Sequence, residues 1–100
     1  MKKIKDMVEH LKDELCDAQT YAENYVDKKV MGDTQSASKF KEMSTDELKH
    51  ATYIHDMVIE EIKKIQAAGI TPPADMEEQW SLEHKKYVEQ YAWIKQMLAL

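Results

Sequence analysis

Two glutamates and one histidine have the residue types and the spacing of a metal site on helices. Glu47 and His50 are three residues apart, so on a helix their side chains share one face. Glu14 lies about 33 residues upstream. An unpaired carboxylate inside a protein costs several kcal/mol, so an inward-facing acid needs a partner such as a metal ion. These three residues therefore predict a metal site in a helical bundle.

Each of three predicted helices carries one acid within or beside its apolar stripe. At about 3.6 residues per turn, Glu14 falls on the edge of the first stripe, Glu47 almost at the centre of the second, and Glu83 points inward in the third. The first stripe consists of Ile4, Met7, Val8, Leu11, Leu15, Ala18, Ala22 and Tyr25. The second consists of Phe40, Ala51, Ile54, Val58, Ile62 and Ile65, and the third of Met76, Trp80, Tyr87, Tyr91, Ile94 and Leu98.

Glycine and proline divide the chain into three helices. Gly32 ends the first, and the segment 69–73, which contains Gly69 and two prolines, cannot be helical. We therefore predict helices over about 4–31, 35–68 and 74–98 in one all-α domain of residues 1–100. Short connections make neighbouring helices antiparallel, which gives a three-helix up-down-up bundle. In that arrangement Glu14 lies level with the Glu47 and His50 turn of the second helix.

Composition restricts the class of protein. The chain has 100 residues, of which 43% are hydrophobic and 33% charged, with a net charge of −5. No basic face is present for a nucleic acid, and no apolar run has the ~18 residues of a membrane span. Cys16 is the single cysteine and cannot form an internal disulfide. We expect a cytoplasmic protein that binds neither nucleic acid nor membrane.

The pattern resembles the first helix pair of the rubrerythrins, in the ferritin-like superfamily. The resemblance rests on Glu14, the following Tyr21-Ala22, and Glu47-Leu48-Lys49-His50 within the segment 37–51. It implies that Glu14, Glu47 and His50 are ligands of a di-iron site, with oxidase or metal-storage chemistry. Resemblance to the third helix of the family extends to Glu83, Glu89 and Tyr91.

The chain departs from that family in ways that predict a dimer. It has no fourth helix and no second Glu-x-x-His, and Lys86 stands where the family has an acid. About six residues join the second and third helices, too few for a long crossover. One chain thus supplies half of a two-metal site, so we predict a ferritin-like fragment completed by homodimerisation. Carboxylate and imidazole ligands suit Fe, Mn or Zn.

The same residues also have simpler interpretations. Glu14 can be a solvated acid, Glu47 can pair with a lysine such as Lys95, and His50 can be a rim residue bonded to a carboxylate. For Glu83 an ion pair is the favoured interpretation. The other histidines are predicted to lie at the surface or rim: His10, His55 and His84. Together these interpretations describe a non-enzymatic helical interaction module with a vestigial, metal-free site.

Overall fold

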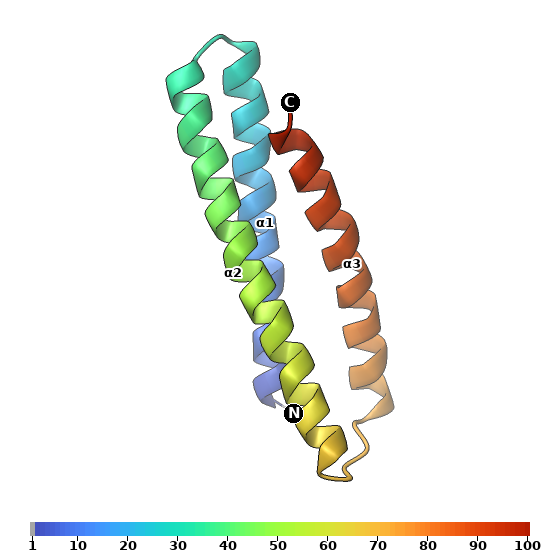
Figure 1. The fold of residues 1–100 in the computed structure, drawn as a ribbon. Helices are drawn as coiled ribbons and strands as arrows, with labels where there is room; N and C mark the ends of the chain where they lie inside the picture. The colour runs from blue at the N-terminus through green and yellow to red at the C-terminus, as the bar shows by residue number, and fades with distance from the viewer. Residues whose placement is uncertain (1) are drawn as a thin grey trace.

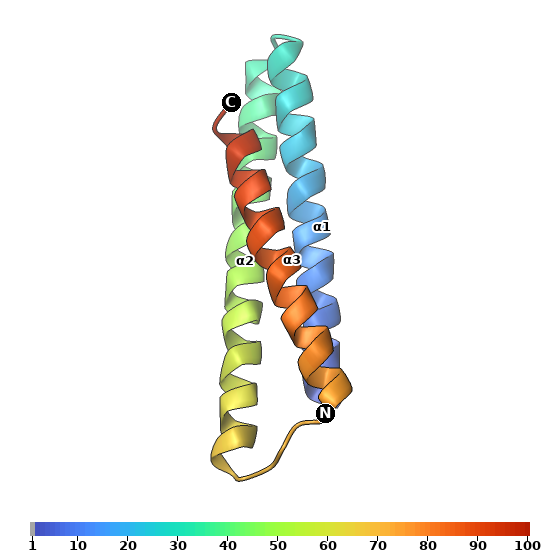
Figure 2. The same cartoon turned by 90° about the vertical axis from the view of Figure 1, so that its right-hand side faces the viewer.

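Three antiparallel helices form an elongated bundle, as the sequence predicts. The computed structural model describes residues 2–100, and within them it contains α1 (Lys2–Val30), α2 (Thr34–Ala67) and α3 (Ala74–Leu98) and no strand. The bundle measures 56 × 18 × 17 Å. Figures 1 and 2 show α1 and α2 side by side as a long hairpin, with α3 slanting across one side of it. The predicted boundaries agree with the helices to within about two residues.

Both turns follow from local chemistry. Gly32 and Gly69 have φ angles of 81° and 75°, the left-handed conformation that glycine adopts without a steric penalty. Asp33 then caps α2, because its side chain accepts a hydrogen bond from the Ser36 backbone N–H at 3.1 Å. Pro73 precedes α3, where a missing N–H costs no helical hydrogen bond.

The core lies along the hairpin and at the C-terminal end of α3. The main core cluster consists of Leu11, Leu15, Ala18, Ala22, Tyr25, Ala37, Leu48, Ala51, Ile54, Ile94, Met97 and Leu98. In α3, by contrast, Trp80, Tyr87 and Tyr91 are only half-buried, and Leu82, Val88 and Trp93 are exposed. The third helix is therefore the most weakly covered element of the bundle.

Polar contacts attach α3 at several heights. Gln90 Nε2 donates to Gln19 Oε1 of α1 at 2.9 Å, and the hydroxyls of Tyr87 and Thr52 of α2 lie 3.1 Å apart. The Tyr25 hydroxyl donates to the Leu100 carbonyl at 3.1 Å.

None of the helices in residues 2–100 has an apolar stretch long enough to cross a bilayer.

Candidate metal site

Small residues bring α1 and α2 close together beside the predicted site. Ala18, Ala22 and Ala51 are fully buried, and the buried Ser44 Oγ donates to the Ala18 carbonyl at 2.7 Å. The distance between packed helices depends on the side chains at their contact, so alanine and serine allow a close approach. Glutamate and histidine side chains on the two helices can consequently meet across the α1–α2 interface.

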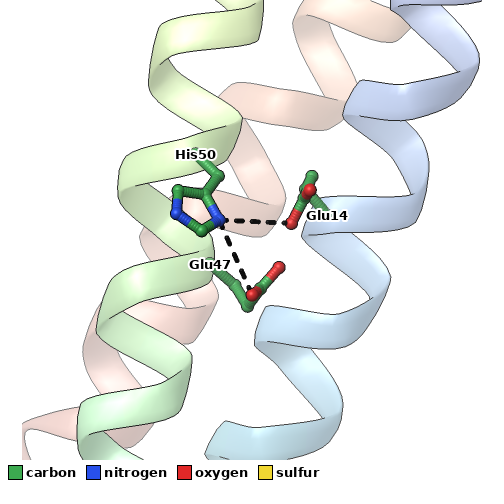
Figure 3. A group of neighbouring side chains, drawn as sticks. All are labelled: Glu14, Glu47 and His50. Carbon is green, nitrogen blue, oxygen red and sulfur yellow. Dashed lines mark ion pairs between the residues drawn. The ribbon is translucent and has the colours of Figure 1, made fainter.

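The structure brings the three predicted residues together. Glu14 extends from α1, and Glu47 and His50 extend from successive turns of α2 (Figure 3). His50 Nδ1 lies 3.8 Å from Glu14 Oε2 and 3.6 Å from Glu47 Oε1. One donor atom from each side chain lies within 4.8 Å of the others. The side chains of Glu14, Glu47 and His50 are 16%, 22% and 54% exposed, so the cluster is half-buried and open to solvent through the imidazole.

His10 adds a fourth side chain, which the sequence interpretation missed. Its Nε2 donates to Glu14 Oε1 at 3.0 Å, from one turn earlier on α1. His10 is predicted to lie at the surface or rim, and it is exposed. Its i, i+4 spacing from Glu14 is the signal that would have revealed the contact. A hydrogen bond of this kind orients a carboxylate whose second oxygen faces the other two side chains.

Glu47 lies on the same face of α2 as Ile54 and Val58, which are both buried, so its direction agrees with the predicted stripe. Its own side chain is 22% exposed, so the stripe is not fully covered at this point. The cluster faces away from α3, which lies behind both hairpin helices in Figure 3.

Lysine does not neutralise the two carboxylates of the cluster. Within residues 2–100, no lysine lies at ion-pair distance from Glu14 or Glu47. Lys95, the partner considered for Glu47, instead lines a groove between α2 and α3 with Leu48 and Tyr91. Among residues 2–100, the side chains at ion-pair distance from these two acids are therefore only His10 and His50.

Glu83 lies elsewhere and forms the predicted kind of contact. Its carboxylate is 3.5 Å from Lys86 Nζ, one turn further along α3. It borders a cavity of about 550 Å³ between the N-terminal halves of α1 and α3, whose apolar walls include Val8 and Trp80. Glu83 is thus an ion-paired residue apart from the cluster, in agreement with the favoured interpretation of the sequence.

Comparisons with protein-family models, with curated proteins and with solved structures give no match to this chain. The resemblance to rubrerythrins accordingly stays a prediction based on Glu14, Glu47 and His50.

Proposed function

We propose that this protein binds divalent metal ions through Glu14, Glu47 and His50. The observation that carries the proposal is the convergence of these donor atoms within 4.8 Å, in the absence of any lysine paired with either acid in residues 2–100. Two neighbouring carboxylates repel each other, and a bound cation converts that repulsion into attraction. Metal binding is the simplest use of such an arrangement.

The donor set fits Fe, Mn or Zn. Carboxylates and imidazole bind these ions at about 2.0–2.2 Å, so the donors of one ion lie about 3 Å apart. The three side chains are near this spacing, and rotation of the half-exposed His50 side chain can close the remainder. His10 would hold Glu14 in orientation through its other oxygen.

A homodimer completes the proposed site. Two hairpins facing each other would supply four carboxylates and two imidazoles from four helices, the complement of a ferritin-like two-metal centre. Apolar side chains surround the cluster at helical spacing: Tyr21 and Phe40 lie two turns from Glu14 and Glu47 and stack with their ring centroids 6.4 Å apart. Met43, one turn from Glu47, is exposed. Association through this face would cover these side chains and bring the two half-sites together.

The proposed chemistry follows from the rubrerythrin resemblance. Two metal ions held by bridging carboxylates support the reduction of dioxygen or peroxide, or the oxidation and storage of iron. The carboxylates of the protein would supply negative charge for these ions, and the partly buried side chains would fix the positions of the ligands. A cytoplasmic location is part of the proposal, because the only cysteine, Cys16, is an exposed free thiol.

A second candidate function is a helical interaction module without metal. The exposed apolar residues of α3, Leu82, Val88 and Trp93, favour it. In that case a protonated His50 between the two carboxylates would be a purely structural ion pair.

Metal analysis after anaerobic loading with Fe²⁺ separates the two functions. The wild-type protein should retain iron through gel filtration, and the double variant Glu14→Gln/Glu47→Gln should not. Glu42→Gln is the matched control, since Glu42 is an exposed acid on the same helix. A wild-type protein that retains no more iron than the double variant would refute metal binding and leave the interaction module.

A further inference from the structure

A second pair of histidine nitrogens connects α2 to α3, further along α2 than the Glu14 cluster. His55 Nε2 of α2 and His84 Nδ1 of α3 lie 2.8 Å apart. His55 was expected at the surface or rim, but it is only 7% exposed, whereas His84 is exposed to solvent. The burial of His55 arises from the aromatic residues of α3, which the helical pattern of α2 alone does not reveal.

Asp56 determines which nitrogen of His55 carries the proton. Its Oδ1 lies 3.1 Å from His55 Nδ1, and a carboxylate oxygen only accepts hydrogen bonds, so Nδ1 donates. The Nε2 lone pair of neutral His55 is then free, and His84 Nδ1 donates to it. A carboxylate on the far nitrogen is the usual support of a metal-binding histidine, because it fixes the ring and raises its basicity.

Aromatic rings hold the His55 imidazole in place. Tyr87 stacks on it with ring centroids 4.2 Å apart and an interplanar angle of 14°. Trp80 lies 5.4 Å from His55 and 5.8 Å from His84, between ring centroids. The Tyr87 hydroxyl is itself within hydrogen-bond distance of Thr52 at 3.1 Å. The buried ligand is therefore preorganised, and the exposed one leaves the site accessible.

We propose that His55 Nε2 and His84 Nδ1 together bind one late first-row divalent cation, with water completing its coordination. Two imidazole nitrogens at about 2.0–2.1 Å from one ion lie about 2.9–3.4 Å apart, close to the observed 2.8 Å, and the exposed His84 ring turns so that its Nδ1 lone pair points at the ion. On binding, the His84 proton leaves Nδ1 and a proton is taken up from water at Nε2, so the imidazole stays neutral and no net charge is lost. The ion replaces a single hydrogen bond between α2 and α3 by two coordinate bonds.

The donors select the class of ion. Imidazole suits copper, zinc and nickel, and affinity for nitrogen donors is greatest for Cu²⁺ among the divalent first-row ions. The Glu14 cluster, with two carboxylates, suits earlier ions better. The His55–His84 site is independent of that cluster, and each proposal can fail without the other.

Copper quenching of tryptophan fluorescence tests the site directly. The chain has two tryptophans, and only Trp80 touches the histidine pair, since Trp93 is exposed. In a Trp93→Phe background, Cu²⁺ should quench Trp80 in a saturable manner at one equivalent. His84→Gln should raise the Cu²⁺ concentration that gives half-maximal quenching at least tenfold. Because His84 is exposed, this variant retains the fold. His55→Gln should raise this concentration by a similar factor. The variant that carries both substitutions should bind Cu²⁺ no more weakly than either single variant.

Two control variants assign the signal. His10→Gln removes an exposed imidazole outside the pair, and Glu14→Gln/Glu47→Gln removes the carboxylates of the other cluster. Both should leave the copper titration of Trp80 unchanged. Quenching that His84→Gln leaves intact, or that disappears with the carboxylate variant, would overturn the proposal. Wild-type protein that shows no saturable quenching would overturn it equally.

Discussion

Replacing Glu47 by glutamine removes one of the two negative charges of the cluster while keeping the size of the side chain. If the cluster is a metal site, the metal-free protein tolerates this repulsion and Glu47→Gln relieves it. If Glu47 instead only forms an ion pair with a protonated His50, the same substitution removes a favourable contact at a pH where imidazole is charged. Where imidazole is uncharged, the two accounts differ in the effect of an added metal ion, which stabilises the protein only if the cluster is a metal site.

The magnitude follows from the separation of the charges. Two unit charges 4.8 Å apart repel by about 0.9 kcal/mol at a permittivity of ~80 and by about 3.5 kcal/mol at ~20. Burial of the two acids favours the higher value, whereas salt and the water that reaches the cluster beside the 54% exposed His50 screen the pair, so we expect a gain of at least the lower value. A gain of about 1 kcal/mol raises the melting temperature of a domain this size by about 4–8 °C.

Thermal melts in chelator at pH 8 measure this gain, since imidazole is ordinarily uncharged there and does not mask the repulsion. Addition of Mn²⁺ should then stabilise the wild type, by about 2.7 kcal/mol at a hundredfold excess over Kd, and should not stabilise Glu47→Gln. Glu42→Gln should follow the wild type in both conditions. A lower melting temperature for Glu47→Gln in chelator, with no Mn²⁺ effect on the wild type, would refute the reasoning.

Three further predictions concern assembly and folding. The protein should sediment as a dimer at tens of micromolar, with at least ~1,200 Å² buried in total, and a monomer at that concentration would refute association through the cluster face. Ser44→Ala should lower the free energy of unfolding by about 1 kcal/mol in urea titrations, because the Ala18 carbonyl loses the hydrogen bond from a buried hydroxyl; an unchanged midpoint would show that the bond contributes nothing. The backbone N–H of Ser36 holds the pKa of Asp33 below its ordinary value. This cap stabilises the fold above about pH 4, and the stabilisation is lost as the pH falls through the lower pKa of the folded state. Asp33→Ala should therefore lower the melting temperature by a few degrees at pH 7, and the difference should disappear in acid; a difference independent of pH would contradict a charged cap.

The helices were predictable because their ends depend on local chemistry. Gly32 and Gly69 occupy left-handed positions that few other residues adopt, and Asp33 caps the helix that follows. The convergence of Glu14 with the Glu47 turn was also predictable, since a short turn fixes the register of an antiparallel hairpin.

Residue environments that depend on two partner helices were not predictable. The partial exposure of the Glu47 side chain, at 22%, depends on how the neighbouring helices dock. The burial of His55 likewise depends on Trp80 and Tyr87 of α3, which are distant in sequence. A hydrophobic pattern gives the direction of a stripe on one helix, but not which part of a wide stripe a third helix covers.

Native mass spectrometry with Mn²⁺ tests the central claim most directly, because it counts chains and metal ions in one measurement. Mn²⁺ prefers carboxylate donors, so it reports on the Glu14 cluster rather than on the histidine pair. We predict a dimer that carries two Mn²⁺ ions, and loss of both ions in Glu14→Gln/Glu47→Gln. A wild-type chain that binds no more Mn²⁺ than this double variant would contradict the account.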